Sequence, residues 1–234
     1  FGQDVILSRY FDTPRPLERE SETNVFQTGS TFNHVLGSWR WTVTGNYARN
    51  ANQTRTTRNA DFTALRAGVL AGTVNPFAPD FGANLLFLAP DLASSLNQNM
   101  DVRSTLAGTV LKLPAGDVQM TFASGLTRQM LNSETWRSSV TNDVALRRNI
   151  MNHSVNAELP LTNRDFGLGS VIGEWAINGN IGSSDLSDFG QLLDYGAGLR
   201  WAPASNLTFQ ASITGDENAP GIGQIGNPTL VTPN

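Results

Sequence analysis

Apolar and polar residues alternate along much of the chain, which is the pattern of a β-strand with two chemically different faces. In residues 39–47, one face carries Trp39, Trp41 and Tyr47, and the other face carries only Arg, Thr and Asn. With this segment, we predict about nine strands. The other eight are residues 5–10, 24–36, 102–110, 118–126, 151–161, 171–181, 193–201 and 207–214.

Short and long connections alternate between these segments. Short turns rich in Gly, Pro, Asn and Asp are expected at residues 36–38, 114–117, 162–168 and 203–206. Longer loops are expected at residues 11–23, 49–98, 130–147 and 182–191. Alternate connections of an up-and-down sheet fall at opposite ends, so one rim should carry tight turns and the other long loops. Short periplasmic turns and long extracellular loops are typical of transmembrane β-barrels.

The alternating segments are also longer than ordinary strands. Membrane strands need about 9 to 11 residues, whereas strands of soluble proteins usually have about five or six. We therefore predict an all-β fold, an antiparallel up-and-down transmembrane β-barrel segment. Trp39, Trp41, Trp175 and Trp201 lie near short turns or strand starts, where an aromatic girdle would meet the membrane interface.

The polar positions of these strands would line the lumen of such a barrel. We expect most of them to hydrate the lumen or to contact a plug, and fewer to contact a ligand. This set comprises Arg40, Asn46, Asn152, Asn156, Glu158, Glu174, Asn178, Asn180 and Arg200.

Composition narrows the function classes. Charged residues make up 15% of the 234 residues, against about a quarter in a typical soluble domain. The net charge of -4 provides no basic surface for nucleic acid, and the absence of cysteine excludes disulfides and thiolate chemistry. No apolar run approaches the roughly 18 residues of a membrane-spanning helix.

Candidate chemistry is sparse. His34 and His153 lie in different predicted strands, at different distances from the nearest short turns, so we expect no joint metal site. Asp185, Asp188 and Asp194 lack the spacing of a calcium loop and are expected to solvate a loop. With no arrangement of nucleophile and base, we expect no enzyme activity and no cofactor.

The long predicted loop at residues 49–98 is the better place to seek ligand capture, because it mixes cations with aromatic residues. A gating or disordered loop is an equally good interpretation. The residues concerned are Arg55, Arg58, Arg66, Phe62, Phe77, Phe81 and Phe87.

Several segments resemble TonB-dependent outer-membrane receptors. Residues 101–117 (DVRSTLAGTVLKLPAGD), with the strand ending at residues 125–128, resemble the strand, turn and returning strand of that family's barrel. Residues 74–77, 157–161, 193–203 and 207–212 are similar to loop and strand sequences of that family. Residues 218–228 resemble its Arg-Ala-Pro segment, although Glu217 and Asn218 stand where Phe and Arg are usual. The resemblance covers most of the chain from Asn24 onward.

The resemblance implies a barrel of about 22 strands in the outer membrane of a Gram-negative bacterium, with a plug domain in its lumen. Such a receptor takes up a scarce ligand, such as a siderophore, vitamin or glycan, with energy from the TonB complex. The implied partners are outer-membrane lipid, the plug domain, the remaining strands and the TonB complex.

We expect residues 1–234 to be an internal part of that barrel domain, because no plug, TonB-binding box or signal peptide is recognisable. Such a part would leave two unpaired edges and should neither transport nor fold stably in a membrane alone. A small passive porin and a secreted β-rich binding protein remain the alternatives.

Overall fold

The computed structural model describes residues 16–82, 85–138, 140–165 and 167–228. Eight antiparallel strands form one sheet in which spatial order follows chain order. They are β1 (Arg19–Leu36), β2 (Trp39–Thr56), β5 (Asp91–Leu113), β6 (Gly116–Arg137), β7 (Val140–Thr162), β8 (Glu174–Leu186), β9 (Gly190–Ala204) and β10 (Leu207–Asp216). The predicted all-β, up-and-down architecture is confirmed, and seven of the nine predicted segments lie entirely within these strands. The predicted strand at residues 5–10 lies outside the described residues.

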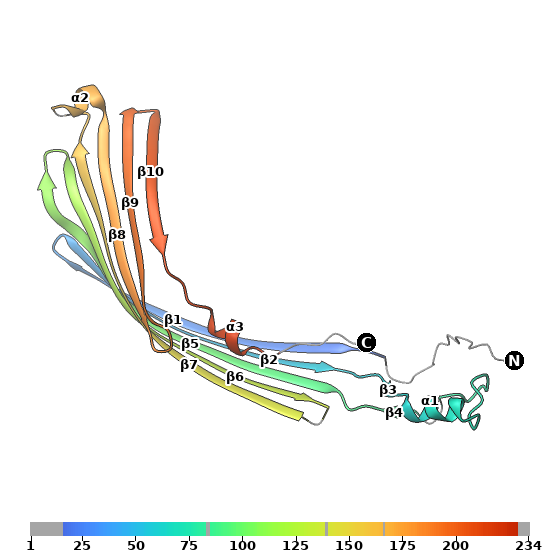
Figure 1. Cartoon of the computed structure of the whole chain (residues 1–234). Helices are drawn as coiled ribbons and strands as arrows, with labels where there is room; N and C mark the ends of the chain where they lie inside the picture. The colour runs from blue at the N-terminus through green and yellow to red at the C-terminus, as the bar shows by residue number, and fades with distance from the viewer. Residues whose placement is uncertain (1–15, 83–84, 139, 166, 229–234) are drawn as a thin grey trace.

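The remaining elements are short. The β2–β5 connection contains β3 (Ala60–Asp61), α1 (Thr63–Leu70) and β4 (Leu86–Phe87), and β3 pairs with β4. This group extends beyond the ends of β2 and β5 (Figure 1). Two further helices are α2 (Gly169–Ile172), between β7 and β8, and α3 (Ile222–Gly226), after β10.

The predicted long loops at residues 130–147 and 182–191 are wrong, and the loop at residues 49–98 is much shorter than predicted. β6 continues to Arg137 and β7 begins at Val140, while only residues 187–189 separate β8 from β9. The β2–β5 connection spans residues 57–90. In these outer parts of the strands apolar and polar residues no longer alternate regularly, while the backbone ladder continues.

The predicted strand at residues 171–181 is also wrong for its first three residues. Val171 and Ile172 belong to α2, and Gly173 follows with a φ of 84° before β8 begins at Glu174. A positive φ is readily adopted only by glycine, so Gly173 ends the helix and redirects the chain into the strand.

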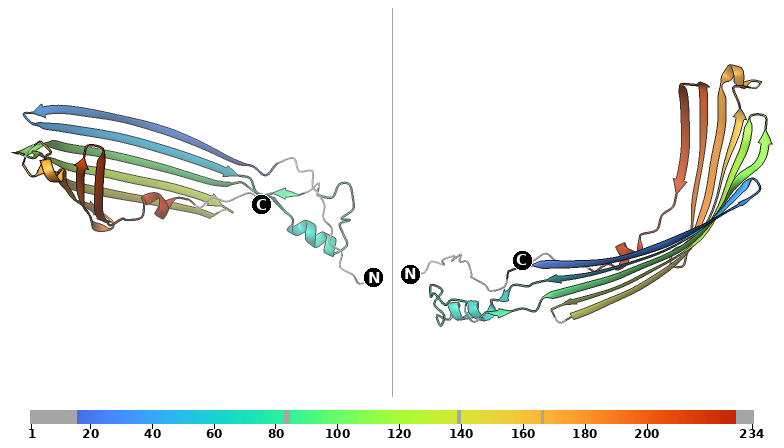
Figure 2. Two further views of the ribbon diagram at one scale, coloured as in Figure 1. Left: turned by 90° about the horizontal axis from the view of Figure 1, so that it is seen from above. Right: turned by 180° about the vertical axis from the view of Figure 1, so that it is seen from behind.

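The sheet is a single curved layer (Figure 2). Among the described residues, only α3 lies against the concave face of the strands, and no second sheet packs against either face (Figures 1 and 2). The buried apolar residues of the described chain are correspondingly few, namely Ala60, Ala123, Leu131, Leu186, Ala202 and Ile222. The strands are therefore held together by their backbone hydrogen bonds and cross-strand contacts rather than by a conventional core.

Glycines on the convex face make room for aromatic rings. A Cβ on Gly108 would lie 2.7 Å from the Ser38 carbonyl oxygen and 2.7 Å from a carbon of the Trp39 ring. A Cβ on Gly215 would lie 2.6 Å from the ring of Tyr195 in the same way. Covering a strand glycine with an aromatic ring compensates for the side chain that the glycine lacks.

The substitution Gly108→Ala should lower the free energy of unfolding by about 1 to 3 kcal/mol, because the new methyl group meets backbone as well as the ring. The measurement is urea unfolding of the chain folded in zwitterionic micelles. Gly45→Ala is the matched control, since a Cβ there has no neighbour closer than 3.9 Å. Equal effects of the two substitutions would contradict the importance of the Trp39–Gly108 contact.

Candidate membrane-facing and luminal surfaces

The convex face carries an apolar band across the sheet, interrupted by one polar row of Ser104, Ser124, His153 and Ser183. Register partners share a face of a sheet, so each row of partners can be followed from strand to strand. One such row consists of Trp41, Leu106, Phe122, Val155, Ile181 and Tyr195, on β2 and β5 to β9. Ile181 is 61% exposed and Tyr195 is 59% exposed, so nothing within the described chain covers this face.

The band has the height of a membrane core. On β2 the convex positions are apolar or glycine from Trp39 to Tyr47, and Arg49 is the first charged one. Nine residues of strand span about 30 Å, and a tilt of about 40° reduces this to about 23 Å. That height is close to the roughly 25 Å apolar belt of a typical outer-membrane barrel.

The four tryptophans predicted at the membrane interface lie together on the convex face, near the rim that carries the β1–β2, β7–β8 and β9–β10 connections. The rings of Trp175 and Trp201 stack at 5.1 Å between centroids, and Trp41 Nε1 donates a hydrogen bond to Ser104 Oγ at 2.9 Å. Trp39 lies 6.2 Å from Phe122. Their placement at a membrane interface stays a prediction.

Sequence reasoning missed the phenylalanines of this rim. Phe32 lies edge-on to Trp41 at 5.9 Å, Phe122 lies beside Trp39, and Phe209 stacks on Trp201 at 5.3 Å. All three occupy the apolar positions of predicted strands, so the alternation itself was the signal that could have found them.

Aromatic residues also mark the opposite border of the band. The rings of Phe26 and Tyr47 lie 6.1 Å apart on β1 and β2. Arg49 is the register partner of Phe26, so the chemistry changes there from aromatic to charged. Two aromatic borders that enclose an apolar belt are the arrangement of a strand sheet in a bilayer.

The concave face is polar at the same height, and all nine predicted lumen-facing residues lie on it. They interact mainly with one another and with neighbouring polar groups. Asn46 donates to Asp101 at 3.0 Å, Ser184 donates to Asn152 at 2.8 Å, and Arg200 lies 3.8 Å from Glu174. The hydrogen-bonding capacity of this face is thus partly satisfied within the wall.

Several polar side chains on the concave face lie over glycines of the adjacent strand. A Cβ on Gly198 would collide with Asn178, and one on Gly196 would collide with Asn180. In the same way, a Cβ on Gly29 would collide with Asn46, and one on Gly182 would collide with Asp194. These side chains therefore lie along the sheet, which keeps the polar layer thin.

The two histidines are far apart. His34 stands on β1 beside Phe32, whereas His153 stands on β7 with its Nδ1 3.1 Å from Ser124 Oγ, and three strands separate them. Within the described residues, no group of three or more His, Asp or Glu is arranged to hold a metal ion.

The three aspartates do not form a common loop either. Asp194 faces the concave side and Asp185 is the register partner of Met151 on the convex side. Asp188, in the β8–β9 turn, is exposed and also ion-paired with Arg148, a partner that the prediction of a solvating group did not include.

The cations and aromatics of the predicted capture loop are spread over several elements. Arg55 belongs to β2, Arg66 to α1 and Phe87 to β4, while Phe62, Phe77 and Phe81 lie in the connecting segments. Arg58 is 3.9 Å from Asp91 at the start of β5. The structure does not gather these residues into one site.

The segment after β10 folds back onto the concave face, a feature with no sequence signal. Arg148, only 3% exposed, donates to Asp188 at 2.7 Å and to the Pro220 carbonyl at 2.8 Å. The guanidinium also lies 5.0 Å from the ring centre of Phe189. Arg148 thereby ties the β8–β9 turn to the chain that leads into α3.

α3 itself covers an apolar cluster on the concave face. A Cβ on Gly226 would lie 2.6 Å from Leu146 and 2.9 Å from Leu131, and Ser133 Oγ donates to the Gly226 carbonyl at 2.7 Å. Ile222 is also buried. Glycine at residue 226 is what permits this close approach.

Comparison with protein-family models, with curated proteins and with solved structures found no match for this chain. None of the helices within the described residues is long and apolar enough to cross a bilayer.

The Arg148–Asp188 pair should make the docking of α3 depend on pH. Hydrogen bonds from Arg148 lower the pKa of Asp188 below its ordinary value near 3.8. A lowered pKa stabilises the folded form above the ordinary pKa, and this stabilisation disappears as pH falls through the lowered value. The protection of residues 222–226 against hydrogen exchange, relative to the intrinsic rate at each pH, should therefore fall below about pH 4.

Asp188→Asn should accelerate that exchange already at neutral pH, because it leaves the buried guanidinium without its counter-charge. Asp185→Asn, which removes a charge from the neighbouring strand end without touching Arg148, is the control. Unchanged exchange in Asp188→Asn would show that α3 is held by its apolar contacts alone.

Proposed function

We propose that this chain forms part of the wall of a transmembrane β-barrel in a bacterial outer membrane, and that the barrel belongs to a TonB-dependent receptor. The observation that carries the proposal is the pairing of two surfaces on one sheet. The convex face is mainly apolar over the height of a bilayer core, and the concave face is mainly polar over the same height. This is the reverse of a water-soluble sandwich, whose inward faces are apolar.

The open edges support a barrel with more than eight strands. β1 and β10 each have a strand neighbour on one side only, and every residue of β1 is exposed. An unpaired edge cannot face lipid, so further strands would have to close the sheet. A closed eight-stranded barrel fills its interior with side chains, whereas this concave face is polar and open.

The polar concave wall fits a lumen wide enough for a plug. The Asn and Asp side chains that lie flat over glycines leave space in front of the wall, and their remaining hydrogen-bonding groups suit contact with a plug domain or water. In such a receptor the ligand would be a scarce solute, and energy would come through the TonB complex. The wall contributes shape and hydration to this process, and no catalytic step.

Strand extensions beyond the band fit the same function. β5, β6 and β7 have 23, 22 and 23 residues, about twice the length that a membrane core requires. Their distal halves would stand in the external medium and carry the β2–β5 connection outward. This geometry suits capture of a solute before it enters the lumen.

A secreted β-rich protein is disfavoured by the uncovered convex face, because contiguous apolar patches of this extent are rare on monomeric soluble proteins. A passive porin would share the same wall. Solute uptake by cells producing this protein would separate the two barrel functions, because collapsing the energy supply of the inner membrane stops an importer and leaves passive diffusion unaffected.

The membrane-facing role of the convex band is tested by Val155→Arg. An arginine on the lipid face near the bilayer midplane costs about 2 to 4 kcal/mol, whereas one facing the lumen costs little. The fraction of chain that refolds from urea into zwitterionic micelles should therefore fall steeply. Micelles suit this chain because water at the micelle rim can solvate the two open edges.

Asn156→Arg is the matched control, since it places the same side chain one residue away on the concave face. Its refolding should stay close to that of the unmodified chain. Equal losses in both variants would mean that the two faces meet the same solvent, and the proposed wall function would fail.

A further inference from the structure

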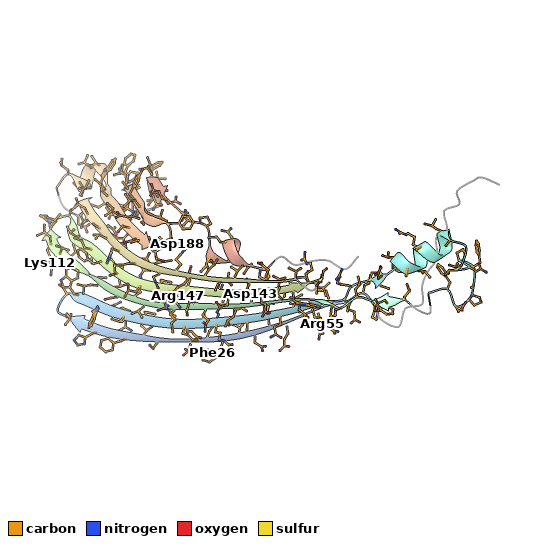
Figure 3. All side chains as sticks on the ribbon, turned by 60° about the horizontal axis from the view of Figure 1, so that its bottom comes forward. Phe26, Arg55, Lys112, Asp143, Arg147 and Asp188 are labelled. Carbon is orange, nitrogen blue, oxygen red and sulfur yellow. The ribbon has the colours of Figure 1, made fainter. Side chains whose placement is uncertain are left out.

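Exposed arginines lie just beyond the apolar band on the convex face. Arg128 is two residues past Leu126 on β6, which is about 7 Å along the strand. Arg147 on β7 and Arg49 on β2 belong to the next row outward, which also contains Gln98 and Met130. Arg147 is labelled in Figure 3, which turns the underside of the sheet toward the viewer.

Two of these cations are close neighbours. Arg128 pairs with Asn149, and Arg147 lies two residues from Asn149 on the same face, so the two guanidinium groups are diagonal cross-strand neighbours. Such neighbours have Cβ atoms about 7 Å apart, within reach of long side chains. Like charges at this spacing repel each other unless an anion lies between them.

No carboxylate of the described chain lies within 4.0 Å of Arg128 or Arg147, whereas five other arginines of the chain have such a partner. The acidic groups on the same face include Asp185, opposite Met151, the pair Glu134 and Asp143, farther out, and Glu20 and Glu22 on β1. None of these carboxylates forms an ion pair with Arg128 or Arg147.

An apolar groove leads from Arg128 into the band, and Arg147 stands on β7 beside its outer end without lining it. The groove has a volume of about 540 Å³, and Met100, Val102, Leu126 and Met151 line it within the band. Arg128 and Asn149 line its outer end, and Asp185 borders it on the β8 side. Its apolar portion suits an acyl chain, and its outer end suits a headgroup with negative charge.

We propose that this groove binds an anionic phospholipid or phosphorylated glycolipid, with its phosphate between Arg128 and Arg147 and an acyl chain along the groove. This inference rests on the proposed membrane-facing role of the convex band. Guanidinium groups form bidentate, charge-assisted hydrogen bonds with phosphate, which relieves the repulsion between the two arginines. A soluble phosphate would gain only the headgroup contacts, so the apolar groove selects a lipid.

The test uses the full chain folded in zwitterionic micelles. Quenching of its tryptophans by brominated phosphatidylcholine reports contact of the convex face with lipid. Phosphatidylglycerol or phosphatidylcholine is then titrated, and the lipid retained per chain after gel filtration gives the relative affinities. Two cations near an anionic headgroup should favour phosphatidylglycerol on the order of 10-fold or more.

Arg128→Gln combined with Arg147→Gln should remove most of this preference, and the corresponding double Lys variant should keep it. Arg40→Gln combined with Arg103→Gln removes two cations from the concave face and should leave the preference intact. Circular dichroism verifies that each variant retains its sheet.

Quenching without a preference for phosphatidylglycerol, or an equal loss in the concave variant, would overturn the lipid site while leaving the wall function standing. Absence of quenching would overturn both. Competition by free glycerol phosphate as effective as that by phosphatidylglycerol would show a soluble anion site instead.

Discussion

The structure depends on one constraint, which is that a single layer of strands must satisfy its backbone hydrogen bonds within itself while its two faces meet different surroundings. The ladder from β1 to β10 provides the bonds, and the strict period of two along each strand separates the side chains. With so few buried apolar residues, the sheet has no core to define an inside. The curvature of the sheet and the chemistry of its side chains distinguish the inside from the outside.

The two faces support this single layer in different ways. On the convex face, large rings cover glycines, as Trp39 covers Gly108, so that apolar surface is kept where the side chains are missing. On the concave face, Asn178 and Asn180 lie over glycines instead and make the polar layer thin. Glycines of the same strands thus allow a smooth outer surface, where rings cover them, and a thin inner layer, where polar side chains lie over them.

Charge is arranged by height as well as by face. Arg128 and Arg147 stand beyond the convex apolar band without a carboxylate partner, whereas Arg148, adjacent in sequence, faces the concave side and is buried against Asp188. Neighbouring arginines therefore have unrelated roles because successive side chains of a strand point to opposite faces. Arg148 organises the chain that carries α3, and Arg147 remains free to meet an anion of the surroundings.

The sequence alone determined the all-β class, seven of the strands, the shared face of Trp39, Trp41, Trp175 and Trp201, and the polar set on the opposite face. Alternation reports these features because it follows from the contrast between two environments. Tertiary structure decided where the strands end, since residues without regular alternation, such as those in 130–137, pair through their backbone regardless of side-chain chemistry. It also decided the docking of α3, because Arg148, Asp188 and Pro220 meet only when distant segments fold together.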